Sequence, residues 1–546
     1  MKLYKLYTFS AILFISSIIV GQDLSKVVVV ESAYKPEIEN SEKYGSMPAL
    51  IDTAKTNINI EYSVLPSRLQ TSYNIKPIKP AKLVGSPLDE LYKSQVRLGL
   101  GNYTTPLAEF SIHNLRSKDY AVGAYVFHRS SHAKLELEDG SKVPAGYGKN
   151  QANAYGKRFY KGVNAEAEVY FNSDKYRFYG YNTQRVTDTT LDVGDIKQFY
   201  TKFGARTSVY STKADSSAFS YRFGLEAFYF GDAYKYRENV LNIPARLSFN
   251  ISDFRLDAGI GYTGYFQKYD TLNTEHVINV HPLLRKRKDD WEIAVGGNFF
   301  YAEDKAFFFP EAQLMFTVVD KVLEAFVGIN GNLKINSYEK LSLENPYIKP
   351  GLQTGNTNTK LNGFGGLQGL ITRNSGYKAN VSFKSIENAI FFINDTVGEM
   401  GNQFISVSDN MEVFSLKGEL WFKPLSFLDF YLQGNYNNHN TASELKAWHL
   451  PVYTLNFTTS FNFKEKIFVN LDLLNIGTRY AYNFEHPNMP HLLDPIWDIN
   501  LKLEYKYSEV LSGFIDVYNI LSKQYYLWNQ YPTQKLNVLI GFSYKF

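Results

Sequence analysis

The chain has 546 residues, no cysteine and a formal net charge of +4 at pH 7. Without cysteine it can form neither disulfide bonds nor an acylated lipoprotein anchor. Charges of both signs are mixed along the sequence and no basic stripe marks a nucleic-acid surface, so we expect no nucleic-acid partner. Aromatic residues reach 16%, with 42 Tyr and 40 Phe. This content suits the aromatic girdles of a membrane barrel better than a soluble core.

Residues 1–21 have the pattern of a secretory signal peptide. Lys2 and Lys5 precede an apolar run over residues 9–20, which is too short to span a bilayer. Small residues follow, so we expect cleavage after Gly21. The alternative is a short hydrophobic first helix of a soluble protein.

Residues 22–93 differ from the rest of the chain in composition. They carry six prolines and no sustained hydrophobic period, and residues 75–80 have the pattern of an extended polyproline-type stretch. A segment of about 70 residues with so many prolines cannot build a large core of its own. We predict a short, irregular N-terminal extension in the periplasm or in the lumen of a barrel.

Residues 94–546 have the alternation of a series of long strands. In residues 163–171, Val, Ala, Ala, Val and Phe alternate with Asn, Glu, Glu and Tyr, and residues 453–463 and 497–507 alternate in the same way. Such runs match transmembrane strands, which need about 9 to 11 residues at a steep tilt. No later segment approaches the roughly 20 apolar residues of a transmembrane helix. The prediction is an all-β fold, a transmembrane antiparallel β-barrel.

A soluble sandwich or propeller is the alternative all-β fold. Its buried faces would be rich in Val, Ile and Leu, and its other faces would not need charges such as Glu166, Glu168 and Lys502. In a wide barrel these charges face a water-filled lumen. The charges therefore favour the barrel.

Turns and loops indicate the number of strands. Short polar turns at residues 172–175 and 250–253 alternate with longer polar stretches, as short periplasmic turns alternate with long outer loops in these barrels. This gives about 20 to 22 strands, and we predict the even number 22. Long outer loops are expected at residues 130–158, 336–358, 436–449 and 479–494.

The last strand, residues 535–546, alternates up to the C-terminus. Apolar residues occupy every second position on one side, and Leu539 alone interrupts the polar side. An apolar face that ends on an aromatic residue resembles the terminal signal of outer-membrane barrels. The resemblance implies that Phe542, Tyr544 and Phe546 are recognised by the barrel-assembly machinery during insertion.

The closing stretch also resembles the TonB-dependent receptors, outer-membrane importers with a plugged 22-strand barrel. Residues 513–521 read Gly-Phe-Ile-Asp-Val-Tyr-Asn-Ile-Leu, and Gln-Tyr-Tyr follows at 524–526. This is similar to the penultimate strand of that family. The chain departs from the family at the other end, because residues 22–93 are shorter than a family plug and lack its Gly-rich loops. The resemblance thus implies a receptor-type barrel with a truncated or absent plug.

A valine-rich segment near the expected mature N-terminus resembles the TonB box of that family. The segment consists of Val27, Val28, Val29, Val30 and Glu31. The resemblance implies that a TonB-type energy transducer binds it by strand addition. A plain β-branched strand at a sheet edge is the open alternative.

Histidines offer two candidate metal sites. His128 and His132 are spaced i, i+4, which brings side chains together on a helix but not at the end of a strand. His486, His491 and Asp494 fall in a long loop, where solvated side chains are expected. We predict no metal site and no cofactor.

Outer-membrane barrels can be enzymes, and the sequence offers one candidate catalytic pair. His128 lies near Ser130 and Ser131, the residue types of a base and its nucleophile. We expect no residue to complete a Ser-His-Asn set, and we predict that the protein is not an enzyme. The carboxylates of Asp289 and Asp290 belong to a charged, solvated turn.

Four glycines in residues 360–369 have the composition of a phosphate-binding loop. No helix is expected to follow them, and a helix N-terminus is what such a loop needs. We predict instead that they let a strand bend or pack closely.

These observations favour a non-enzymatic, receptor-type barrel set in outer-membrane lipid. It is expected to act as an importer, or as a subunit of an outer-membrane transport or assembly complex. A passive porin is the alternative, and an outer-membrane hydrolase is less favoured. The richness in Lys, Asn and Tyr indicates a Gram-negative source of the Bacteroidota type.

Overall fold

The computed structural model describes residues 91–181, 194, 196–212, 219–269, 271–395, 397–398 and 400–546. Twenty-two of the described strands pair edge to edge, all antiparallel, in one sheet. The barrel strands are β1 (Ser94–Gly101), β2 (Thr105–His113), β3 (Tyr120–Ser131), β6 (Tyr147–Phe159), β7 (Val163–Arg177), β8 (Lys197–Ser211), β9 (Phe219–Gly231), β10 (Arg237–Ile251), β11 (Phe254–Lys268), β12 (Leu272–Arg287), β13 (Trp291–Ala302), β14 (Lys305–Val319), β15 (Leu323–Lys334), β16 (Thr357–Thr372), β17 (Ser375–Asn394), β18 (Phe404–Leu425), β19 (Leu428–Thr441), β20 (Tyr453–Phe463), β21 (Ile467–Ile476), β24 (Ile496–Lys506), β25 (Leu511–Tyr518) and β28 (Asn537–Lys545).

Smaller elements lie in the connections between these strands. They are β4 (Lys134–Glu136), β5 (Lys142–Pro144), β22 (Arg479–Ala481), β23 (His491–Leu493), β26 (Tyr526–Trp528), β27 (Tyr531–Pro532) and the helix α2 (Tyr338–Glu344). No helix in the described ranges is long and apolar enough to cross a membrane.

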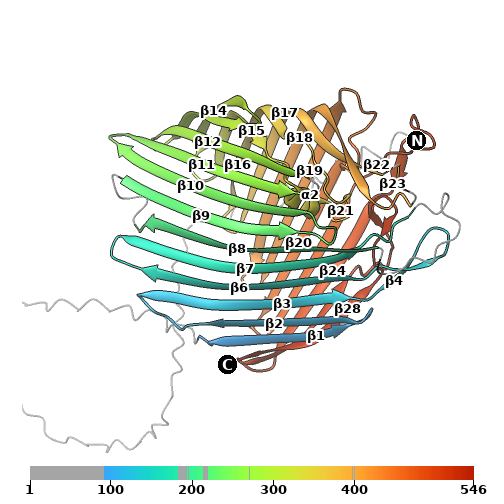
Figure 1. The fold of residues 1–546 in the computed structure, drawn as a ribbon. Coiled ribbons are helices and arrows are strands. Elements are labelled where there is room, and N and C mark those ends of the chain that lie inside the picture. Colours follow the sequence, from blue (N-terminus) through green and yellow to red (C-terminus); the bar gives the residue numbers. More distant parts are fainter. Residues whose placement is uncertain are drawn as a thin grey trace, which may run out of the picture. The chain divides into compact units, whose positions relative to one another are not determined.

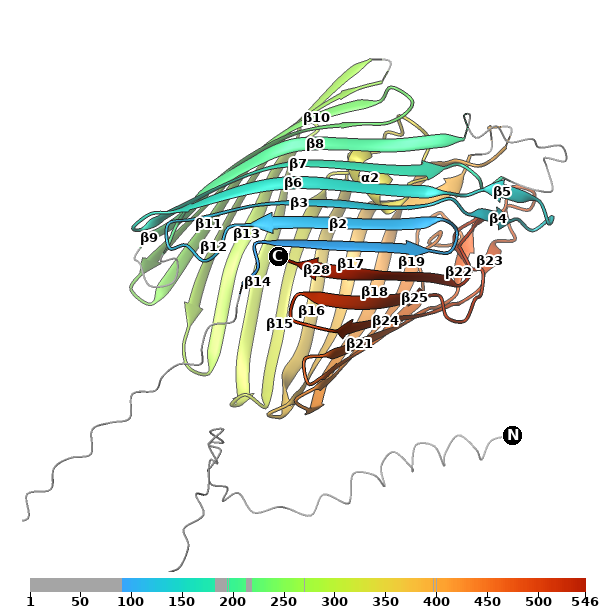
Figure 2. The ribbon, with the colours of Figure 1, turned by 90° about the horizontal axis from the view of Figure 1, so that it is seen from below.

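The sheet closes where the first and last strands meet (Figures 1 and 2). β1 pairs with β2 on one edge and with β28 on the other, in a register that runs from Gln95 opposite Lys545 to Gly101 opposite Leu539. Closure leaves no unpaired edge, which is the condition for strands to cross a bilayer. The predicted 22-strand barrel is confirmed.

Alternation gives the last strand an outer apolar face and a mostly polar inner face. On β28, Ile540, Phe542 and Tyr544 are exposed on the outside, whereas Asn537 and Ser543 are buried on the inside. An apolar exterior of this kind faces lipid. The expected membrane-facing side of the last strand is therefore the exposed side of the barrel.

Leu539, which interrupts the polar side of the last strand, belongs to a small apolar cluster inside the wall. It is buried with Leu107 and Phe514, and the Arg97 guanidinium lies 3.8 Å from the centre of the Phe514 ring. A Cβ at Gly541 would lie 2.1 Å from the Leu98 carbonyl oxygen and 2.4 Å from the Phe514 ring. Only glycine leaves room for this ring to lie flat on the wall.

The two ends of the barrel differ in their connections. β1 begins and β28 ends at the end where the connections are short, such as the two residues 252–253 between β10 and β11. Longer connections, with α2 and the three small hairpins, lie at the opposite end (Figures 1 and 2). Short turns are periplasmic and long loops are extracellular in such barrels, so the end with α2 is the extracellular end.

Three expectations about turns and loops were wrong. Residues 172–175 lie inside β7, paired with both β6 and β8. In the expected loop 130–158, only residues 132–146 connect two barrel strands, because the rest belongs to β3 and β6. In the same way residues 436–441 belong to β19. Strands that face a watery lumen and extend to the rim tolerate polar residues on both faces, so polarity alone misplaced these boundaries.

Candidate functional site

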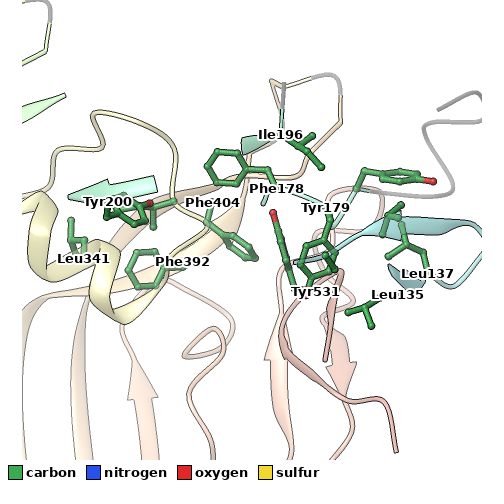
Figure 3. Close-up of a cluster of buried hydrophobic side chains, with 14 of the residues drawn as sticks. Leu135, Leu137, Phe178, Tyr179, Ile196, Tyr200, Leu341, Phe392, Phe404 and Tyr531 are labelled. Atoms are coloured by element: carbon green, nitrogen blue, oxygen red, sulfur yellow. The ribbon is translucent and has the colours of Figure 1, made fainter. Parts of the chain in front are cut away.

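The extracellular connections pack together over the outer mouth of the barrel. Their shared core consists of buried side chains from β4, β5, α2, the ends of four barrel strands and the loops between them, with members Ala133, Leu135, Leu137, Val143, Ala145, Phe178, Tyr179, Tyr181, Ile196, Tyr200, Phe230, Tyr236, Tyr338, Leu341, Ile348, Phe392, Phe404 and Tyr531. We call this assembly the lid. Figure 3 shows its side chains in a row that runs from α2 to the hairpin of β4 and β5.

Segments from opposite sides of the barrel meet directly in the lid. The rings of Tyr347, which follows α2, and Tyr531, in β27, stack with centroids 3.7 Å apart. The Tyr179 hydroxyl donates to the Pro532 carbonyl at 2.8 Å, and the Asn402 amide donates to the Phe178 carbonyl at 2.8 Å. These contacts join the connections β7–β8, β15–β16, β17–β18 and β25–β28, so the lid bridges the mouth.

A buried polar contact ties α2 to the β9–β10 connection. Asp232 accepts from the Tyr338 hydroxyl at 2.8 Å and from the backbone N–H groups of Tyr234 and Tyr236, each at 2.9 Å. Burial raises the pKa of Asp232 above its ordinary value, although these hydrogen bonds act in the opposite direction. Asp232 thus depends on Tyr338 for one of its few partners.

A second contact region of the lid centres on His449, in the β19–β20 connection. Its Nε2 accepts from the Asn529 backbone N–H at 3.2 Å, so its Nδ1 carries the hydrogen and donates to the Phe392 carbonyl at 3.0 Å. Burial, with the nearby Arg479 charge, lowers the pKa of His449 to about 3. Arg479 is itself buried and donates to the carbonyls of Tyr526 and Leu527. Both residues hold the connections together through backbone groups.

Below the lid, one wall of the lumen contains a cavity of about 1280 Å³. Its charged side chains form pairs between neighbouring strands. Glu166 lies 3.4 Å from Lys157 Nζ and 3.7 Å from Arg222 Nη1, and Glu168 lies 2.6 Å from Arg206 Nη2. The opposite wall, on β16 to β19, has amide and ammonium side chains around a further hollow of about 540 Å³. The lumen suits a polar ligand and has no single charge sign.

The structure places the predicted metal candidates apart from any ligand set. His132 is exposed beside the Thr104 carbonyl, at 3.3 Å. His486, His491 and Asp494 lie in the connection between β21 and β24. In the part of the chain that the structure describes, no three His, Asp or Glu side chains gather as metal ligands would.

The predicted charged turn and glycine-rich segment lie where they were expected. Asp289 and Asp290 are exposed between β12 and β13. Residues 360–369 lie inside β16, and a Cβ at Gly366 would come within 2.2 Å of the Ala379 carbonyl oxygen. Gly366 therefore allows β16 and β17 to pack closely.

One expectation about catalytic residues was wrong, because a Ser-His-Asn set is present. The Ser130 hydroxyl lies 3.2 Å from His128 Nε2, and His128 Nδ1 lies 2.7 Å from Asn150 Oδ1. Sequence analysis missed Asn150 because it was assigned to a loop, whereas it lies in β6 directly opposite His128. A correct strand register would have been the signal that finds it.

The remaining predicted residues lie at the two ends of the chain. Phe542 and Tyr544 point outward from β28, and Phe546 exchanges backbone hydrogen bonds with Ser94 at the seam. The segment Val27 to Glu31 lies outside the described residues.

Comparison with solved structures finds the same fold in outer-membrane receptors. The ferric-catecholate import receptor Fiu of E. coli K12 matches with a TM-score of 0.62 at 10% identity, over 84% of this chain and 82% of that one. The siderophore receptor PirA of Acinetobacter baumannii matches with a TM-score of 0.66 at 11% identity, over 84% and 81%. The pyoverdine receptor FpvA of Pseudomonas aeruginosa PAO1 matches with a TM-score of 0.62 at 12% identity, over 85% and 79%.

No family model and no curated protein matches the sequence. The resemblance of the closing stretch to TonB-dependent receptors is confirmed at the level of the fold, because the barrel of this chain matches the fold of these solved receptors.

Proposed function

We propose that the protein is a gated, receptor-type transport barrel of the Gram-negative outer membrane. The observation that carries the proposal is the lid, whose buried aromatic core joins connections from opposite sides of the mouth. A passive porin needs a permanently open path through its lumen. A lid with a packed core lies across that path. The apolar exterior of the barrel supports the membrane location.

Conductance in planar bilayers tests the gate. We expect the purified protein to be silent or to open rarely, because the lid must come apart to admit ions. Large, constant and ligand-independent currents would contradict the proposal and support a porin.

The ligand is proposed to be polar and of mixed charge, because ion pairs line one lumen wall and amides the other. Two of the solved neighbours are a ferric-catecholate import receptor and a pyoverdine receptor. Iron chelates are therefore the first ligands to assay. Binding is measured by the quenching of intrinsic fluorescence on titration with each chelate, with the metal-free chelator as control.

We further propose that Val27, Val28, Val29, Val30 and Glu31 bind a TonB-type energy transducer. The motif resemblance supports this, and strand addition is the expected mode. Deleting residues 27–31 is expected to abolish ligand uptake while the barrel stays in the membrane. Unchanged uptake would favour the other version, a subunit of an outer-membrane complex, and then stoichiometric partners should co-purify in mild detergent.

The C-terminal aromatic residues are proposed to contact the barrel-assembly machinery. Their outward side chains, on the strand that closes the barrel, support this role for Phe542, Tyr544 and Phe546. Deleting Phe546 is expected to lower the amount of assembled barrel in the outer membrane. A source of the Bacteroidota type is proposed from composition, and the genome that encodes the chain tests it.

A further inference from the structure

Three polar side chains form a linked set near the extracellular ends of β3 and β6. Ser130 Oγ lies 3.2 Å from Nε2 of His128, and His128 Nδ1 lies 2.7 Å from Oδ1 of Asn150. Ser130 and His128 are two positions apart on β3 and therefore share a face. His128 and Asn150 are direct partners across the ladder between β3 and β6. Cross-strand pairing thus holds all three in register.

The hydrogen bonds fix the roles of the two imidazole nitrogens. The Asn150 amide nitrogen donates to the Ser173 carbonyl at 3.3 Å, which leaves Asn150 Oδ1 as the acceptor facing His128. His128 must then carry its hydrogen on Nδ1, and the lone pair on Nε2 is directed at the Ser130 hydroxyl. This is the order of orienting group, base and nucleophile that activates a serine.

The set lies on the outside of the barrel. Val122 and Val126 lie on the same face of β3 as His128 and Ser130. Their side chains are 45% and 48% exposed, as expected for residues that face lipid. The neighbouring Ser131 points the other way, because it accepts from Gln534 at 2.9 Å and is buried. Ser130 and His128 therefore face the membrane side of the wall.

The set also lies at a defined depth in the membrane. Toward the extracellular end, apolar outer positions are followed by polar ones on three adjacent strands. On β3 Val126 precedes His128, and on β7 Phe171 precedes Ser173 and Lys175. Such a change marks the boundary between hydrocarbon and headgroups. The ester groups of membrane lipids lie at this boundary.

A glycine lies beside the nucleophile on the neighbouring strand. Gly148, the pairing partner of Ser130 on β6, has no side chain. A Cβ built there would lie 3.7 Å from the Ser130 Cβ and 3.7 Å from the Lys175 side chain. Lys175 is exposed, so a cation lies on the other side of this glycine. This arrangement fits an anionic lipid whose acyl ester lies over Ser130.

We infer that the outer wall carries a serine ester hydrolase site for membrane lipids. Ser130 is the nucleophile, His128 is the general base, and Asn150 is a positioning residue that holds the imidazole. The inference concerns the outside of the barrel and is independent of transport through the lumen.

The reaction balances without any further reagent. Ser130 Oγ attacks the ester carbonyl carbon, and its proton passes to His128 Nε2. The adduct expels the alkoxide, which takes that proton and leaves as the alcohol, so the acyl group remains on Ser130. Water then attacks the acyl-serine and gives a proton to His128. Collapse returns this proton to Ser130 and releases the carboxylic acid.

The test uses the full-length protein in vesicles. One vesicle type contains phosphatidylethanolamine and phosphatidylglycerol, and another contains lipopolysaccharide, because either lipid class presents ester-linked acyl chains. Released fatty acid is measured by mass spectrometry, and a fluorophosphonate probe reports an activated serine. We expect labelling and release from at least one vesicle type, and the responsive type identifies the substrate class.

Variants separate catalysis from folding. Ser130→Ala and His128→Ala are expected to lose about 1000-fold or more in rate. The control Ser131→Ala removes a neighbouring hydroxyl that faces inward and should react like the wild type. Asn150→Ala should lower kcat by roughly tenfold or more with KM unchanged, and Asn150→Asp should restore it.

Two results would overturn the inference. One is a folded wild-type barrel, judged by its heat-modifiable gel mobility, that is neither labelled nor active on either vesicle type. The other is a Ser130→Ala variant as active and as strongly labelled as the wild type. Conductance and ligand binding should not change in Ser130→Ala, so failure here is distinct from failure of the proposed transport role.

Discussion

The lid core and the outer-wall site both lie at the extracellular end of the barrel, but they are built from segments at very different distances along the chain. In the lid, Tyr179 and Pro532 are 353 residues apart and meet through loop packing. In the wall, His128 and Asn150 are 22 residues apart and meet because two adjacent strands pair in one register. Substitutions in the lid should therefore alter permeation and leave hydrolysis unchanged. Substitutions in the outer-wall site should alter hydrolysis and leave permeation unchanged.

The largest effect on the lid is expected from Tyr531→Ala. Tyr531 is 2% exposed and stacks on Tyr347, so truncation leaves a cavity at the centre of the lid. We expect a loss of about 3 to 5 kcal/mol in lid stability and frequent openings in planar bilayers. Phe203→Ala, on the lipid-facing side of β8, is the matched control. If the Tyr531→Ala protein conducts no current in planar bilayers, then the lid is not what closes the path through the barrel.

Acid should weaken the lid through His449. A free histidine titrates near pH 6.5, whereas burial lowers the pKa of His449 to about 3 in the folded lid. Unfolded loops therefore bind a proton that the folded lid excludes, and stability falls as the pH drops from 6.5 toward 3. By pH 5 the loss is about 2 kcal/mol.

Protease cleavage of the lid as a function of pH measures this effect. His449→Gln keeps a side chain of similar size and cannot titrate, so its cleavage should be less sensitive to pH. Equal sensitivity in both proteins would assign the acid response to other groups.

A smaller effect is expected from Tyr338→Phe. The substitution removes the hydroxyl that donates to Oδ2 of the buried Asp232 carboxylate, and the two backbone N–H groups continue to donate to Oδ1. We expect a loss of about 1 kcal/mol in lid stability, seen as a modest rise in opening frequency. Tyr453→Phe, in the wall strand β20, serves as control. A rise in opening frequency as large as that of Tyr531→Ala would contradict the ranking.

The smallest change in stability is expected from Gly148→Ala on the outer wall. The new methyl group would meet only ordinary contacts at 3.7 Å, so stability should change by less than about 0.5 kcal/mol. It adds a methyl group beside Ser130, so we expect hydrolysis to fall severalfold with conductance unchanged. Unchanged hydrolysis would place the substrate elsewhere on the wall.

Much of the barrel was predictable from local sequence patterns. The period-two alternation of residues 163–171 and 497–507 identified strands, and the charges on their polar faces required a lumen. Strand boundaries were not predictable in this way, because polar residues at the outer rim have the composition of loops. Residues 172–175 and the first part of β6 were misassigned for this reason.

The sequence by itself determined the class of fold, the lipid-facing side of the last strand and the end of the barrel that holds its longer connections, because these depend on neighbouring residues within a strand or a turn. Only the tertiary structure decided that Asn150 lies opposite His128 and that Tyr347 stacks on Tyr531. The first contact depends on strand register, and the second depends on packing between distant loops. Neither property leaves a period in the sequence, since many registers and loop packings satisfy the same alternation.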